Sequence, residues 1–213
     1  MNEFENALEK YQVTAGELTE TAREKIQQYC VMLWHKNQQI NLTRHTDWET
    51  FVCRDLLDTL ELSKLIDQNQ EVLDVGTGGG VPGLLLAILR PDLEVTLAES
   101  VGKRALILAE FAANLDVDVQ IYQERAEKVV KDFRFDVTIA RAVGSIAKFC
   151  KLFNGHWLNV NRMLALKGPN WVNEQKEAAA EKLDSEIAIK VCCEYEIPGL
   201  EWQSVIIEIV PKS

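Results

Sequence analysis

The sequence lacks the features that mark membrane, secreted and metal-binding proteins. No apolar run approaches the roughly 18 residues that a transmembrane helix needs. The acidic residues 1–6 have neither the basic nor the apolar segment of a secretory signal. The five cysteines and three histidines show no metal-ligand spacing. We therefore expect a cytoplasmic protein with buried, reduced cysteines, no membrane contact and no metal.

Basic residues are also scarce. The chain has 23 lysines and arginines against 33 aspartates and glutamates, which gives a formal net charge of −10. This balance argues against a protein that holds nucleic acid through a large basic surface. Any nucleic-acid partner must be met by a local basic patch or within a larger assembly.

The 213 residues suffice for one α/β domain with a small extension. Residues 1–67 show helical spacing of apolar residues, with one helix opening near Thr19 and another running from about Asp47, a suitable N-cap, to Leu65. Trp34 and Trp48 lie in this part and are expected to pack in the core, with stacking on bases as the alternative. We predict an N-terminal helical extension over residues 1–67.

From residue 71 onward, short apolar runs alternate with helical stretches, which predicts a parallel sheet with helices on both faces. The last two runs are separated only by Pro198-Gly199, too short for a crossover helix, so they are expected to pair antiparallel. Residues 68–213 should therefore form one domain. The predicted strands are 71–75, 95–98, 119–122, 135–140, 163–166, 189–196 and 202–210.

A glycine-rich turn follows the first predicted strand. Four of the five residues from 76 to 80 are glycines, so a ligand can approach the backbone without meeting a Cβ atom. The register nearest the strand, Gly76-x-Gly78-x-Gly80, looks like the first motif of class I methyltransferases. A later register, ending at Gly83, satisfies the G-x-G-x-x-G spacing of dinucleotide enzymes. Both registers predict a nucleotide site.

Glu99 ends the second predicted strand, where a carboxylate can accept hydrogen bonds from both hydroxyls of a ribose. Methyltransferases and dehydrogenases both place an acid there. Glu99 therefore supports a nucleotide ligand without distinguishing S-adenosylmethionine from NAD(P).

Six short stretches in order, at family-like spacing, make the chain resemble the small-subunit ribosomal RNA methyltransferase G family, also called glucose-inhibited division protein B. The resemblance covers nearly the whole length. The stretches are Asn41-Leu42-Thr43, Arg54 with Leu57-Asp58, Asp74 through Gly83, Ser100 through Arg104, Arg141-Ala142 and Leu166-Lys167-Gly168.

The resemblance implies a class I S-adenosylmethionine-dependent methyltransferase fold, Rossmann-like, with a seven-stranded sheet ending in an antiparallel hairpin. It also implies methyl transfer from S-adenosylmethionine to N7 of a guanine in small-subunit ribosomal RNA. The cofactor-binding residues that it implies are Gly76, Gly78, Val81, Glu99, Ala126, Glu127 and Arg141. Arg141 is further expected to border the substrate and to act in catalysis.

The expected reaction requires no acid–base catalysis by a side chain of the protein. Guanine N7 has a free lone pair and no proton to lose, so attack on the methyl group needs no general base; positioning and charge stabilisation remain. Arg54, Arg104 and Lys167 are expected to contact RNA phosphates. The ribosomal RNA is expected within the assembled or assembling small subunit, because the chain is so acidic.

The chain departs from the family pattern at several positions. Asp55 stands where histidine is usual and puts an acid on a helix expected to face RNA; Thr59 replaces serine, Glu99 replaces aspartate, and Val143-Gly144 differs from the usual aromatic-small pair. Three other functions stay open: methylation of a small molecule or protein, an NAD(P)-dependent oxidoreductase, and a nucleotide-binding module without catalysis.

Overall fold

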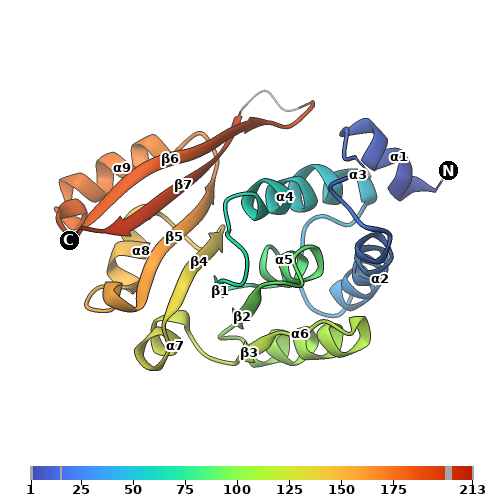
Figure 1. The fold of residues 1–213 in the computed structure, drawn as a ribbon, viewed down its shortest axis with the longest axis horizontal. Coiled ribbons are helices and arrows are strands. Elements are labelled where there is room, and N and C mark those ends of the chain that lie inside the picture. The colour runs from blue at the N-terminus through green and yellow to red at the C-terminus, as the bar shows by residue number, and fades with distance from the viewer. Residues whose placement is uncertain (1, 15, 200–202, 213) are drawn as a thin grey trace.

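The computed structural model describes residues 2–14, 16–199 and 203–212. Its centre is one seven-stranded sheet with helices on both faces (Figure 1). The strands are β1 (Glu71–Val75), β2 (Glu94–Ala98), β3 (Gln120–Tyr122), β4 (Phe135–Arg141), β5 (Val160–Lys167), β6 (Ile187–Glu196) and β7 (Gln203–Pro211). Each predicted strand is confirmed to within three residues at either end; Trp202, predicted to open the last one, lies outside the described residues.

The strand order is β3-β2-β1-β4-β5-β7-β6. Strands β1 to β5 are parallel, whereas β7 runs antiparallel to both β5 and β6. The predicted antiparallel hairpin is confirmed. Its first strand, β6, forms the edge, and its second strand returns beside β5. The order reverses between β1 and β4, so the chain segments leaving these two strands diverge and open a crevice between them.

Helices cover the sheet unequally. On one face lie α1 (Glu3–Lys10), α2 (Glu20–Asn37), α3 (Trp48–Phe51), the π-helical turn η1 (Val52–Leu56), α4 (Leu57–Ser63), α5 (Gly83–Leu89) and α6 (Gly102–Leu115). On the other lie α7 (Ala126–Asp132), α8 (Ile146–Leu152), α9 (Trp171–Ala180) and the 3₁₀ turns η2 (Trp157–Asn159) and η3 (Leu183–Glu186). Alternate strand residues therefore enter two cores, as Val72 and Leu73 do.

The helical extension shares its core with the sheet. Ile26 and Tyr29 of α2 are fully buried in the same cluster as residues of α5 and α6. Asp47 caps α3, as predicted, by accepting a hydrogen bond from the Thr50 N–H at 2.8 Å. The expected helix is continuous from residue 48 to 63, but its middle widens into η1, which apolar periodicity does not reveal. The predicted boundary at residues 67–68 falls in the connection between α4 and β1, and the division there stays a prediction.

The two tryptophans of the extension pack against the core, as expected. The rings of Trp34 and Trp48 meet edge to face, with centroids 4.7 Å apart. The indole N–H of Trp34 donates to the carbonyl of His45 at 2.8 Å. These contacts leave the two rings in structural roles.

The cysteines follow the expectation only in part. All five are free thiols, and Cys30, Cys53 and Cys150 are buried. Cys192 and Cys193 are only half-buried, so the prediction that they are buried was wrong. The reason is that β6 is an edge strand, and its register shifts between Val191 and Cys193.

One hydrogen bond ties the hairpin to the extension. The Tyr195 hydroxyl of β6 donates to Asp58 Oδ1 of α4 at 2.6 Å. Burial raises the pKa of the Asp58 carboxyl, and the Tyr195 hydrogen bond partly counteracts that rise. The hydroxyl therefore stabilises a buried charge that connects two distant segments of the chain.

We expect Tyr195→Phe to lower the free energy of unfolding by about 1–3 kcal/mol, because it leaves a buried carboxylate without its donor. Urea unfolding at pH 7 measures the change. Tyr122→Phe is the matched control, since no hydrogen bond of the Tyr122 hydroxyl occurs within the described residues. Equal losses in both variants would contradict the role given to the Tyr195 hydroxyl.

Candidate functional site

The candidate site lies at the carboxyl ends of β1, β2 and β4, where the strand order reverses. The turn between β1 and α5 carries three glycines with positive φ: Gly76 at 68°, Gly78 at 61° and Gly80 at 109°. Side chains rarely adopt this backbone conformation, so glycine is required for the shape of the turn. The predicted ligand turn is therefore built as its sequence indicates.

Gly83 opens α5 and allows the helix to approach β1 closely. Its N–H donates to Asp74 Oδ2 at 2.8 Å. A Cβ atom on Gly83 would lie 2.5 Å from that oxygen and 2.5 Å from Leu97 Cδ2, so no larger residue fits. The Gly83 of the dinucleotide register is thus needed for helix packing whatever the ligand is.

Glu99, directly after β2, is buried and holds the turn by a hydrogen bond. Its Oε2 accepts a hydrogen bond from the Gly78 N–H at 3.0 Å, and its Oε1 accepts one from the Val101 N–H at 2.8 Å. A carboxylate has about four lone-pair positions, so both oxygens can still accept a ligand hydroxyl. Its predicted role in holding a ribose stays a prediction.

The helical extension supports the turn from the opposite side. The Tyr29 hydroxyl of α2 donates to the carbonyl of Gly79 at 3.0 Å. A Cβ atom on Gly79 would lie 3.2 Å from Leu33 Cδ1 and 3.2 Å from the carbonyl of Leu42. The turn is thus packed directly against the extension, a contact that the spacing of apolar residues did not predict.

Arg141 ends β4 and points to the extension. Its Nη1 donates to Asp55 Oδ1 at 2.5 Å and to the carbonyl of Arg54 at 3.0 Å, and it lies 3.8 Å from Asp58 Oδ2. Burial opposes its charge, but the two carboxylates outweigh burial and raise the pKa of the guanidinium. The same oxygen, Asp55 Oδ1, also lies 2.8 Å from His45 Nδ1.

The position of Asp55 corrects one expectation. Only 1% of its surface is exposed, so it does not present an acid to RNA. It lies in the π-helical turn η1 and forms an ion pair with Arg141, the last residue of β4. The sequence did not reveal this pairing or the part that His45 takes in it, because neither a π-turn nor a contact over 86 residues has a periodic signature.

The loop that follows Arg141 closes over the glycine-rich turn. Ala142 has a φ of 57°, which is unusual for a residue with a side chain. A Cβ atom on Gly76 would lie 3.3 Å from Val143 Cγ2, so the valine lies against the turn. Lys148 Nζ donates to the Val143 carbonyl at 2.6 Å, and Lys167 Nζ donates to the Gly144 carbonyl at 2.5 Å.

The other predicted site residues occupy the same edge of the sheet. Val81 is half-buried in the turn, and Ala126 and Glu127 open α7, directly after the carboxyl end of β3. Arg104 Nη2 donates to the Asn41 carbonyl at 3.1 Å, which ties α6 to the loop after α2. The roles predicted for these residues, and for Arg54 and Lys167 toward RNA, stay predictions.

Two buried oxygens at the turn test whether it fits a nucleotide ligand. Asp74 Oδ1 and Thr77 Oγ1 are buried at the turn, and the Thr77 hydroxyl offsets part of the rise that burial causes in the pKa of the Asp74 carboxyl. The negative charge of this carboxyl, close to the glycines, favours a ligand that carries a positive charge. Together with the glycines that admit such a ligand, these atoms fit S-adenosylmethionine.

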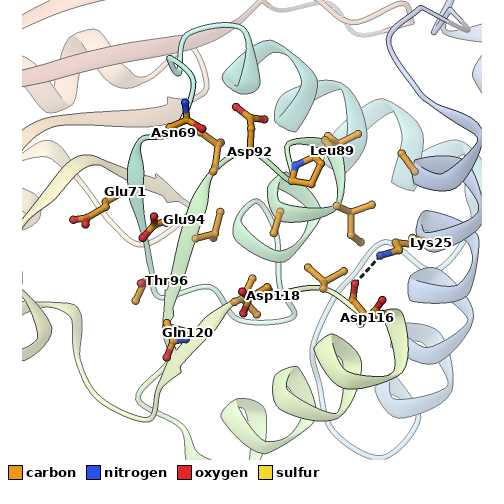
Figure 2. Close-up of a pocket in the computed structure, with 18 of the residues that line it drawn as sticks. Lys25, Asn69, Glu71, Leu89, Asp92, Glu94, Thr96, Asp116, Asp118 and Gln120 are labelled. Atoms are coloured by element: carbon orange, nitrogen blue, oxygen red, sulfur yellow. Dashed lines mark hydrogen bonds between the residues drawn. The ribbon is translucent and has the colours of Figure 1, made fainter.

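The larger of the two described cavities lies elsewhere. It has a volume of about 1160 Å³ and lies near the amino ends of β1 to β3 (Figure 2). None of residues 76–80 of the glycine-rich turn is among its lining residues. Acidic side chains such as Glu71, Glu94 and Asp118 line it, and Lys25 donates to the Asp116 carbonyl at 2.7 Å. Open α/β sheets bind ligands at the opposite, carboxyl edge, so this cavity does not mark the candidate site.

Two searches of the described residues bear on other classes of protein. They contain no group of three or more metal-ligating side chains close enough to hold an ion. No helix among them has both the length and the apolar character needed to cross a bilayer.

Comparisons with known proteins agree with the site. The model of the rRNA small subunit methyltransferase G family matches residues 22–198. A ribosomal RNA small subunit methyltransferase G from Rhodopirellula baltica is 47% identical over 92% of this chain and 83% of its own length. One from Chromobacterium violaceum is 33% identical over 92% of both chains.

A solved structure supports the fold. The precorrin-6y C5,15-methyltransferase from Geobacter metallireducens superposes with a TM-score of 0.55 at 9% identity, covering 82% of this chain and 96% of that one. The predicted fold class, a seven-stranded methyltransferase sheet with a terminal hairpin, is confirmed. The chain belongs to the rRNA small subunit methyltransferase G family.

Proposed function

We propose that this chain transfers a methyl group from S-adenosylmethionine to N7 of a guanine in small-subunit ribosomal RNA. The observation that carries the proposal is the meeting of the glycine-rich turn, Glu99 and Arg141 at the strand-order reversal, in a chain of this family. The oxidoreductase alternative is not favoured, because the family model and the relatives that match this chain are methyltransferases.

The cofactor would lie against the turn. Gly76, Gly78 and Val81 would line its pocket, Glu99 would accept the ribose hydroxyls, and the first residues of α7, Ala126 and Glu127, would hold the adenine end. When bound, S-adenosylmethionine supplies an electrophilic methyl group and carries a net charge of +1, the sum of its sulfonium, ammonium and carboxylate groups. The buried carboxylates of Asp74 and Glu99 favour such a cation electrostatically.

The residues of the chain would position the target and stabilise charge. Guanine N7 needs no general base, so fixed hydrogen-bond donors that orient the base in the cavity suffice. The hydrogen bonds and ion pairs of Arg141 are made through Nη1, and its Nε and Nη2 have none within the described residues. These donors would face the guanine or the cofactor, with Asp55 fixing their direction.

The RNA would be contacted by a small number of basic groups. Arg54 and Arg104 lie beside the site and would orient phosphates, while the chain as a whole carries a net charge of −10. Few phosphate contacts give weak binding to free RNA. We therefore propose that the assembled or assembling small subunit, with its preformed RNA shape, is the substrate, and that the reaction takes place in the cytoplasm.

The reaction itself can be tested directly. Incubation with labelled S-adenosylmethionine and small subunits that lack the modification should place the label in 7-methylguanosine, identified by separating the digested nucleosides. Label in another nucleoside would contradict the N7 assignment. Arg141→Ala is expected to lose at least about a hundredfold in kcat/KM, since it removes the donors that orient the guanine and leaves the Asp55 carboxylate without its cation.

The proposed preference for the assembled small subunit over free RNA gives a second prediction. Initial rates should be higher on assembled small subunits than on the same RNA freed of protein, at equal concentrations and physiological salt. The rate on free RNA should fall only gently as salt increases, because few phosphates are contacted. Equal rates on both substrates would contradict the preference for the subunit.

Asp74 predicts a pH-dependent stability. Burial raises the pKa of its carboxyl from 3.8 to about 6. Between these values the folded state binds more protons than the unfolded state, so the free energy of unfolding falls as pH rises, by up to about 3 kcal/mol. Asp74→Asn has no titrating carboxyl at this position, so its free energy of unfolding lacks this pH-dependent contribution. Its stability relative to the original protein should therefore increase from pH 4 to pH 7.5, measured by urea unfolding.

Asp132→Asn is the control for Asp74→Asn, because Asp132 is an exposed carboxylate at the end of α7. Its stability relative to the original protein should stay nearly constant over the same pH range. An Asp74→Asn difference that is equally flat would show that the Asp74 carboxyl titrates normally.

A further inference from the structure

Lys167 holds the loop that covers the glycine-rich turn. Its ammonium group, at the end of β5, donates to the Gly144 carbonyl at 2.5 Å and to Glu174 Oε2 at 2.7 Å. It also lies 4.9 Å from the centre of the Phe149 ring, as in a cation–π contact. Only 8% of the side chain is exposed. An ammonium has three donors, so these partners leave it little capacity for an RNA phosphate.

Glu174 of α9 extends the same contact to the next helix. The oxygen that accepts from Lys167 also accepts a hydrogen bond from the Ile146 N–H at 3.1 Å. Ile146 is the first residue of α8, and its N–H has no partner within the helix. A single carboxylate oxygen therefore fixes the far end of the loop, residues 142–145, while Lys167 fixes its middle.

The loop conformation requires such support. Ala142 has a φ of 57°, and Gly144 has a φ of 152°. A Cβ atom on Gly144 would lie 2.4 Å from Lys148 Cδ. A residue with a side chain keeps a left-handed conformation only where its surroundings hold it. The ion pair and Lys148 supply those surroundings, since both lysines donate to carbonyls of this loop.

We propose that Lys167 and Glu174 are positioning residues for the cofactor: they hold residues 142–145 so that Val143 stays against Gly76. The inference rests on the proposed function, because it assigns the ligand of the turn to S-adenosylmethionine. It differs from the expected role of Lys167, which was an RNA contact. The pair acts on cofactor affinity through the loop and leaves RNA affinity unchanged.

The experiment compares two affinities in the same variants. Lys167→Met and Glu174→Ala should each weaken the binding of S-adenosylhomocysteine, measured by calorimetry, by about tenfold, as expected for the loss of a charged hydrogen bond. The double variant should lose less than the product of the two single losses, because the partners act together. Filter binding of small-subunit RNA should change less than twofold.

A second ion pair between the same helices provides the control. Lys151 Nζ of α8 and Oε2 of Glu181, which follows α9, lie 2.6 Å apart, but the two side chains are 59% and 50% exposed. Lys151→Met and Glu181→Ala should leave both affinities unchanged. Equal weakening in this pair would overturn the proposal, since general packing of α8 on α9 would then explain the effect.

The outcomes separate the inference from the function on which it rests. If the original protein binds no S-adenosylhomocysteine, the proposed function fails. In another outcome, the original protein binds S-adenosylhomocysteine, while Lys167→Met leaves cofactor affinity unchanged, weakens RNA binding, and reduces the slope of log K against log salt concentration by about one. Lys167 is then a phosphate contact and the inference fails. Should Lys167→Met not fold, Glu174→Gln and Lys148→Met give the same comparison on the same loop, and unchanged cofactor affinity in both would overturn the inference.

Discussion

The parallel pairing of β1 with β4 is the constraint on which the rest of the site depends. Because both strands point the same way, the turn after Val75 and the guanidinium of Arg141 leave the sheet at one edge. The strand order reverses there, so the helices that follow go to opposite faces and leave a crevice. The glycines, the loop 142–145 and the extension all complete this one opening.

Negative charge is concentrated behind that opening. Asp74, Glu99, Asp55 and Asp58 are buried within the elements around it, and Arg141 is the cation that pairs with the last two. Buried carboxylates are costly unless backbone N–H groups or cations satisfy them. The chain uses both means: Gly78, Gly83 and Val101 donate N–H groups, and Arg141 supplies charge. The same arrangement favours a cationic cofactor.

The site is held from three directions by segments far apart in the sequence. Tyr29 of the extension supports the turn at Gly79, and Asp55 of the π-helical turn fixes Arg141. Lys167 and Glu174 hold the covering loop from the opposite face of the sheet. The extension thus supports the glycine-rich turn and Arg141 of the proposed cofactor site, through the side chains of Tyr29 and Asp55.

The sequence by itself determined the succession of strands and helices along the chain, the terminal hairpin and the ligand turn. Periodicity, the Pro198-Gly199 break and the four clustered glycines are local signals, and each corresponds to a local backbone preference. The family motifs likewise predicted the function class. Only the tertiary structure decided which side chains pair across the site: Asp55 with Arg141, Tyr195 with Asp58, and Lys167 with Glu174. The first two pairs bridge long separations, and the third depends on the packing of α9 beside β5. Such contacts leave no periodic trace, because the folded sheet alone brings their partners together.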